Sequence, residues 1–248
     1  MKTTERHHLK DNELAIAIGN AQGWAEKNQQ TLIATVALLV VIAGGIAAYS
    51  AWSRSSETKA RTMLAEAMVI EEARVMPPGP PAGTSTDPTL VPGQAPGTYP
   101  TQQAKLDAAL PKFLAAADAY PKSEAGLTAR YHAATTLVSL ARFDEAIKQY
   151  DQVITGGTGV IQRMSRLGKA EAQVRAGQFD PAIATLKETA EQTTTNLPVD
   201  AVLMELARAY RLAGKTEDAR KTWTQVVEKH AESPLAADAK TELEKLKG

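Results

Sequence analysis

The chain has 248 residues, 44% of them hydrophobic, with no cysteine and with 28 basic side chains against 28 acidic ones. The zero formal charge excludes the broad basic footprint of a nucleic-acid-binding protein, so we expect no nucleic-acid partner. The lack of cysteine excludes disulfides, thiol catalysis and cysteine-ligated metal centres.

Residues 1–30 form an N-terminal tail that begins polar. Within it, Leu14, Ile16, Ile18 and Trp24 predict a short amphipathic helix lying against a membrane surface. The adjacent His7 and His8 lack the further ligands that a metal site needs, so we interpret them as part of a solvated tail.

The next segment, residues 31–52, is an apolar stretch inside a window (28–53) without charged side chains. A helix of 22 residues spans about 33 Å, enough to cross a bilayer core. The alternatives are a buried core helix and a cleavable signal peptide, whose apolar region is usually shorter and closer to the N-terminus. An uncleaved single-span anchor fits best. The small-residue pairs Ala43/Ala47 and Gly44/Ala48 would let another helix approach, which leaves an oligomer open.

The flanking charges give only a weak indication of orientation. Residues 11–30 contain one basic side chain, whereas residues 53–72 contain three, Arg54, Lys59 and Arg61. This count favours a cytoplasmic C-terminal side, although long domains are translocated largely regardless of such charges.

Residues 53–76 predict a further helix, and residues 77–100 a flexible insert. The insert holds 8 of the 13 prolines and 4 of the 16 glycines, which forbids a continuous helix and leaves too few apolar residues for a core. We infer that the helix is the displaced first helix of a repeat unit, with 77–100 inserted in its inter-helix turn.

A repeated pattern fills residues 101–233. Small residues recur at spacings of 37, 36 and 37, each followed four residues later by a large apolar one. The pairs are Ala109 and Phe113, Ala146 and Tyr150, Ala182 and Leu186, and Ala219 and Trp223. Further helices are expected at 127–141, 163–176 and 200–213, and a polar-faced closing helix at 234–248. Such a period is typical of a helical solenoid.

These units closely resemble tetratricopeptide (TPR) repeats. The family's motif is met by Gly177, Phe179, Asp180 and Ala182. The family's tryptophan is missing, with Arg130, Arg166 and Leu203 standing in its place. We therefore predict an all-α chain, in which a single transmembrane helix precedes a TPR-like α-solenoid of three to four helix pairs.

No catalytic constellation is recognisable in the sequence. It contains no phosphate-binding loop, nucleophile elbow or zinc-protease motif, and His132 and His230 lie on different repeat helices. We expect a protein that is not an enzyme and uses no cofactor or metal.

The resemblance implies a concave binding face lined by the first helix of each unit. The matching positions are Tyr131, Thr135, Val138, Leu167, Glu171, Arg175, Met204, Arg208 and Arg211. The apolar centre (Tyr131, Leu167 and Met204) suits an amphipathic or extended partner segment. We expect Arg175, Arg208 and Arg211 to hold carboxylates of the partner.

The order of tail, span and repeats resembles the bacterial inner-membrane TPR proteins that are ancillary subunits of the SecYEG translocon. That resemblance implies an N-terminus in the cytoplasm, repeats in the periplasm, and translocon subunits and periplasmic chaperones as partners. Two alternatives stay open. One is a structural scaffold for envelope or division assemblies, with the proline insert as a spacer. The other is a soluble periplasmic protein released from a signal peptide.

Overall fold

The computed structural model describes residues 24, 27–77, 95–191 and 198–246. Most of the amphipathic helix expected in residues 1–30 and the interior of the proline-rich segment lie outside the described residues. The chain divides into two compact units, Met1–Ser55 and Ser56–Gly248. The boundary between them falls inside one helix.

That helix, α2 (Gln29–Glu71), joins the expected span and the expected following helix without interruption. Its apolar window is long enough to cross a membrane, and none of that window is buried. A core helix of a soluble protein would be mostly buried, so the buried-helix alternative is not supported. A membrane span and a signal sequence both fit this finding.

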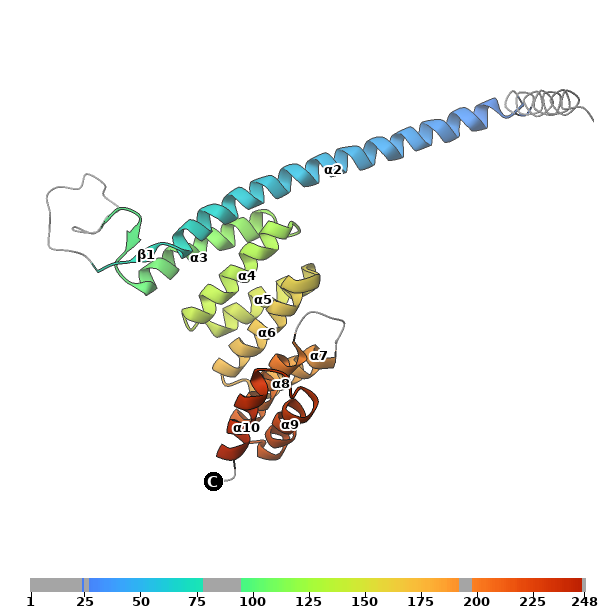
Figure 1. Ribbon diagram of the computed structural model, residues 1–248. Helices are drawn as coiled ribbons and strands as arrows, with labels where there is room; N and C mark the ends of the chain where they lie inside the picture. The colour runs from blue at the N-terminus through green and yellow to red at the C-terminus, as the bar shows by residue number, and fades with distance from the viewer. Residues whose placement is uncertain (1–23, 25–26, 78–94, 192–197, 247–248) are drawn as a thin grey trace, which may run out of the picture. The chain divides into compact units, whose positions relative to one another are not determined.

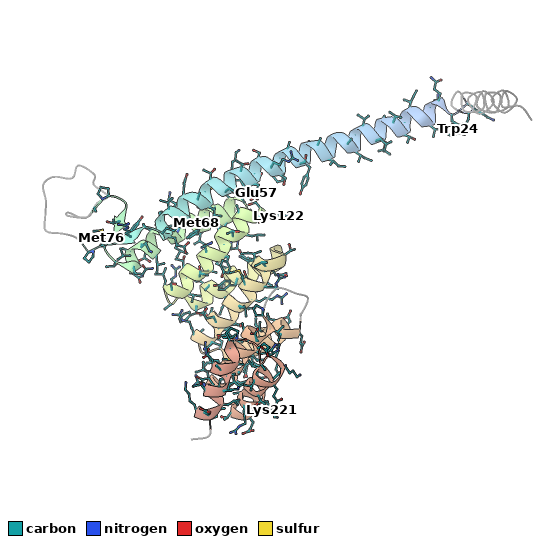
Figure 2. The ribbon with its side chains drawn as sticks, in the orientation of Figure 1. Trp24, Glu57, Met68, Met76, Lys122 and Lys221 are labelled. Atoms are coloured by element: carbon teal, nitrogen blue, oxygen red, sulfur yellow. The ribbon has the colours of Figure 1, made fainter. Side chains whose placement is uncertain are left out.

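In the second unit, the end of α2 packs against α3 (Gln102–Ala119) and α4 (Glu124–Ser139). Ala60 and Ala67 are fully buried, and Met63, Leu64 and Met68 contact the same apolar core. Figure 2 shows Glu57 and Met68 on this part of the helix. The helix ends at Glu71, whereas the sequence predicted that it would reach residue 76.

Polar contacts hold the last turn of α2. The backbone carbonyl of Glu71 accepts a hydrogen bond from Lys105 Nζ at 2.8 Å, and its carboxylate lies 3.0 Å from His132 Nδ1. The His132 ring in turn stacks on Phe113, with centroids 5.2 Å apart. A cation at the carbonyl end of a helix is electrostatically favourable, so the contact with Lys105 stabilises the last turn of α2.

The remaining helices are α5 (Phe143–Gly156), α6 (Gly159–Arg175), α7 (Phe179–Glu191), α8 (Val199–Leu212), α9 (Thr216–Lys229) and α10 (Leu235–Lys245). From α3 to α10, each packs against the next in the chain, which gives the stacked hairpins of a helical solenoid (Figure 1). The predicted α-solenoid is confirmed.

The repeat pattern explains the packing. The alanines of the motif have no exposed surface, so neighbouring helices approach closely at these points. The large residues of the motif, Phe113, Tyr150, Leu186 and Trp223, are at most 2% exposed and fill the space between the helix layers.

Three equivalent turns separate the paired helices. Ala141, Gly177 and Gly214 have φ values of 58°, 74° and 73°. Each turn closes with two backbone hydrogen bonds of the Schellman type, such as Ala141 N–H to Val138 O (3.1 Å) and Arg142 N–H to Leu137 O (2.9 Å). The left-handed conformation favours glycine, so alanine is the strained member of this set.

One element was missed by the sequence analysis. Two short strands, β1 (Arg74–Val75) and β2 (Thr98–Tyr99), pair in parallel and bring the two ends of the proline-rich segment together. Paired strands lie about 4.8 Å apart. The residues that flank the two ends of the segment therefore lie side by side, so the pairing does not support a spacer role.

Candidate protein-binding groove

The described residues form a groove of about 930 Å³. Most of its lining residues belong to α4, α6, α8 and α10. Tyr150 of α5 and Leu186 of α7 also line it. The first helices of successive units therefore line one continuous surface, as the repeat architecture requires.

Seven of the nine predicted face residues line this groove: Tyr131, Thr135, Leu167, Glu171, Arg175, Met204 and Arg208. Val138 does not, because its side chain is buried in the core between the helices. Arg211 lies outside the lining, although its Nε is 4.0 Å from Glu242, which belongs to the lining.

Two tyrosines form one end of the groove. Tyr131 packs edge-on against Tyr150, with ring centroids 5.9 Å apart. Burial raises the pKa of both phenols, and the charge of Glu171 raises the pKa of Tyr131 further. A side chain at Gly168 would place its Cβ 2.5 Å from Tyr150 Cζ, so the close approach of α5 and α6 here requires glycine.

The charged groups of the groove pair with one another. Arg175 lies 3.8 Å from Glu171 and also over the Phe143 ring, 5.1 Å from its centroid. Arg208 lies 3.0 Å from Glu205. These pairs are largely exposed, so each contributes little to stability.

The sequence analysis treated residues 234–248 only as a closing helix. In the structure α10 contributes Leu235, Asp238, Thr241, Glu242 and Lys245 to the groove. A step of 37 residues from Met204 of α8 reaches Thr241 of α10, so the repeat period could have revealed this contribution.

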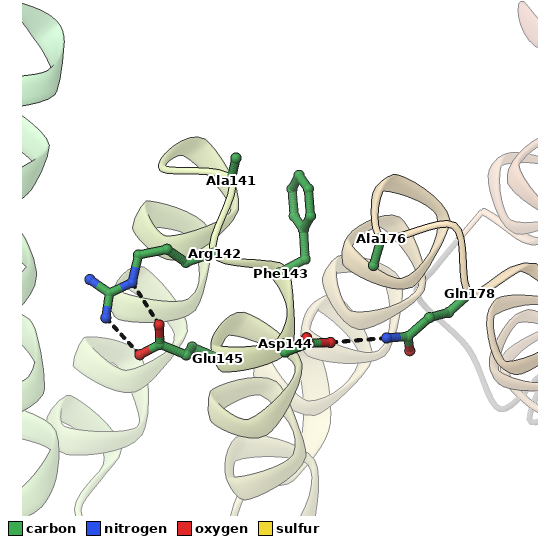
Figure 3. Close-up of a pocket in the computed structure, with 7 residues that line it drawn as sticks. All are labelled: Ala141, Arg142, Phe143, Asp144, Glu145, Ala176 and Gln178. Carbon is green, nitrogen blue, oxygen red and sulfur yellow. Dashed lines mark hydrogen bonds and ion pairs between the residues drawn. The ribbon is translucent and has the colours of Figure 1, made fainter.

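A second cavity, of about 330 Å³, lies where two turns meet (Figure 3). Its polar groups already satisfy one another: Asp144 Oδ1 accepts a hydrogen bond from Gln178 Nε2 at 2.9 Å, and Arg142 pairs with Glu145 at 2.6 Å. One unit further on, Asp180 pairs with Lys215 at 2.6 Å. These contacts join successive units, so we assign this cavity a structural role.

Within the described residues, no group of three or more metal-ligating side chains is found. His132 is engaged by Glu71 and Phe113. The groove is therefore the candidate site, and its chemistry is that of binding.

Comparison with known proteins agrees with this architecture. The tetratricopeptide repeat family model matches residues 201–233, which include most of α8 and all of α9. No curated protein matches the chain.

Among solved structures, the chain is similar to the TPR-like repeats of a kinesin light chain assigned in Podosopora anserina. The identity is 19% and the TM-score 0.51, over 58% of this chain and 79% of that one. It is also similar to MamA from Desulfovibrio magneticus RS-1, with 14% identity and a TM-score of 0.43 over 59% of this chain and 88% of that one.

The chain thus contains a TPR repeat within a TPR-like solenoid. TPR repeats act as protein-interaction modules, so the fold and the groove define the class of protein as a protein-binding repeat scaffold.

Proposed function

We propose that this protein is a membrane-anchored, non-enzymatic adaptor whose groove binds an apolar segment of another protein. The observation that carries the proposal is the groove, in which Tyr131, Leu167 and Met204 from three successive first helices line one cavity. An apolar surface flanked by charged groups suits an amphipathic helix or an extended peptide. The apolar window of α2 supplies the anchor.

The finer part of the proposal concerns the setting. We infer that the N-terminus lies in the cytoplasm and the repeats in the periplasm, where they meet the Sec translocon and periplasmic chaperones. The order of apolar helix and TPR-like repeats supports this assignment, as it matches the arrangement of the ancillary translocon subunits. The flanking charges favour the opposite orientation only weakly.

Site-specific photo-crosslinking in native membranes tests the binding surface. A photoreactive phenylalanine analogue at Leu167 or Met204 is expected to capture a translocon subunit or a periplasmic folding factor. The same analogue at Ala184, which is exposed on α7 outside the groove lining, serves as the control. Capture of division or outer-membrane assembly proteins would instead select the scaffold alternative. Equal capture from Ala184 would contradict groove binding.

Two measurements test the anchor and its orientation. Added protease should cut the repeats in intact spheroplasts, and protection there with cleavage only after lysis would overturn the periplasmic assignment. N-terminal sequencing of the mature chain should begin upstream of residue 31. A mature chain that begins after residue 50 would show that the apolar segment is a signal peptide.

A further inference from the structure

The groove continues in register from α8 into α10. Four groove residues of α10 each lie 37 residues after a groove residue of α8. The pairs are Ala201 and Asp238, Met204 and Thr241, Glu205 and Glu242, and Arg208 and Lys245. Helix α10 is therefore a groove-forming helix as well as a closing one, and it makes this end of the groove polar.

Each cation that lines the groove has an acidic neighbour from the same wall. Arg175 lies 3.8 Å from Glu171, and Arg208 lies 3.0 Å from Glu205. Lys245 Nζ donates a hydrogen bond to Glu242 at 2.7 Å. None of the three is left as a free cation to which a partner's carboxylate would be drawn.

Besides Lys245, Glu242 lies close to Arg211, a further basic side chain at this end of the groove. Its Oε2 is buried and lies 4.0 Å from Arg211 Nε. The hydrogen bond from Lys245, with the charges of Arg211 and Arg208, lowers the pKa of this carboxyl. Glu242 thus stands where the sequence analysis expected a carboxylate of the partner.

Among the residues that line the groove, acidic side chains outnumber basic ones by one. The lining has four acidic side chains (Glu171, Glu205, Asp238 and Glu242) and three basic ones (Arg175, Arg208 and Lys245). Asp238, in the first turn of α10, makes no ion pair with any residue that the structure describes. An incoming basic group would gain an interaction at Asp238 without displacing an existing one.

We propose that the groove selects a partner segment in which an apolar anchor is followed by a lysine or arginine facing Asp238. The apolar anchor occupies the surface of Leu167 and Met204, and the basic residue lies over α10. Glu242 determines specificity by occupying the cations that would otherwise attract an acidic segment. This inference rests on the proposed function, because it names the chemistry of the groove's occupant.

The test uses the full chain in lipid nanodiscs, exposed to a random peptide library displayed on phage. Selected peptides are resynthesised, and their affinity is measured by fluorescence anisotropy at low salt, where exposed charge pairs are least screened. We expect apolar peptides that carry Lys or Arg. Asp238→Asn should weaken their binding about two- to fivefold, as for an exposed ion pair. The matched control, Glu228→Gln, alters an exposed acid on α9 outside the groove lining and should change nothing.

A second variant examines the specificity role separately. Glu242→Gln should enrich acidic peptides from the library, because Arg211 and Lys245 lose their internal partner. Acidic peptides selected by the wild type, or basic peptides bound equally well by Asp238→Asn, would overturn this inference alone. The variant Leu167→Glu should abolish binding of the selected peptides. If no selected peptide loses its binding in this variant, the proposed function itself is overturned, and this inference with it.

Discussion

The carboxylate of Glu57 in α2 accepts a hydrogen bond from the backbone N–H of Glu124, the first residue of α4, at 3.0 Å. It also accepts one from the N–H of Ala125 at 3.2 Å. Two of the unpaired donors at the start of α4 are thus satisfied by another helix, while Ser123 Oγ accepts from a third, Gly126 N–H. Together with the contacts of Glu71, this fastens both ends of the segment 57–71 to the first repeat.

Removal of this cap should loosen the segment. We expect Glu57→Ala to lower the free energy of unfolding by about 1 kcal/mol, the usual cost of losing a helix cap. Hydrogen exchange in residues 57–71 should rise, and that in α3 should rise with it if the segment is the displaced first helix of the repeat. Glu66→Ala, at an exposed position of the same helix, is the control. Exchange of 57–71 as fast as that of the proline-rich insert in the wild type would contradict the insertion hypothesis.

Shortening of the proline-rich insert should leave the repeats folded. Because β1 and β2 already hold its ends side by side, we expect replacement of residues 78–94 by four Gly/Ser residues to change the stability by less than about 1 kcal/mol. The comparison variant is Met76→Pro, which removes the hydrogen bond from Met76 N–H to Tyr99 O (2.9 Å) and should open the pairing. Thermal denaturation followed by circular dichroism measures both. Unfolding of α3 in the shortened chain would show that the insert is part of the core.

The parts of the fold that the sequence predicted are those with a period. The pairing of a small residue with a large one four positions later, as in Ala109 and Phe113, recurs in phase. The turns at positions 177 and 214 carry glycine, the residue that their left-handed backbone favours. The contacts that escaped prediction join residues far apart in sequence without any repeating pattern. Glu57 and Glu124 are 67 positions apart, and the β1–β2 pairing involves two residues on each side.

The groove was predictable where packing follows helical position and unpredictable where it depends on charge pairing. Of the α4 residues predicted for the binding face, Tyr131 and Thr135 line the groove, whereas Val138 turns into the core. The sequence analysis expected the arginines to be available to a partner. Their acidic neighbours within the chain depend on side-chain geometry, which the repeat pattern does not reveal. Glu242 was overlooked for the same reason.

Arg130 of α4 is a buried basic side chain that joins three helices. Its guanidinium is buried and donates to Asp118 Oδ1 (2.7 Å), Gln149 Oε1 (2.7 Å) and Ala117 O (3.0 Å). These bonds tie α4 to α3 and α5.

We expect Arg130→Ala to destabilise the chain by roughly 2–4 kcal/mol, through a cavity and a buried carbonyl left unpaired. Lys148→Ala, on the exposed face of α5, should cost less than about 0.5 kcal/mol. Urea denaturation of the full chain in detergent measures both values. An equal effect of the two substitutions would show that the Arg130 bonds add nothing to stability.

The tyrosine pair predicts a loss of stability in alkali. Burial raises the pKa of Tyr131 and Tyr150 in the folded chain, so a phenol ionises more readily after unfolding. Their contribution is therefore fully present below about pH 10, the ordinary pKa of tyrosine, and is lost as the pH rises above it. Urea denaturation at increasing pH should show this decline, and Tyr150→Phe should make it less steep. An unchanged slope in Tyr150→Phe would contradict the assignment.

Ala141 offers a direct test of the turn geometry. Its φ of 58° is the left-handed conformation that glycine adopts at the equivalent positions 177 and 214. Ala141→Gly should therefore stabilise the chain by up to about 1 kcal/mol, even though glycine usually destabilises through its greater freedom in the unfolded state. The reverse change, Gly177→Ala, should cost a similar amount, since no atom lies within 4 Å of its Cβ position and only backbone strain is introduced. Thermal denaturation of the two variants gives both signs. A destabilised Ala141→Gly chain would mean that the Schellman turn at this position is not strained by alanine.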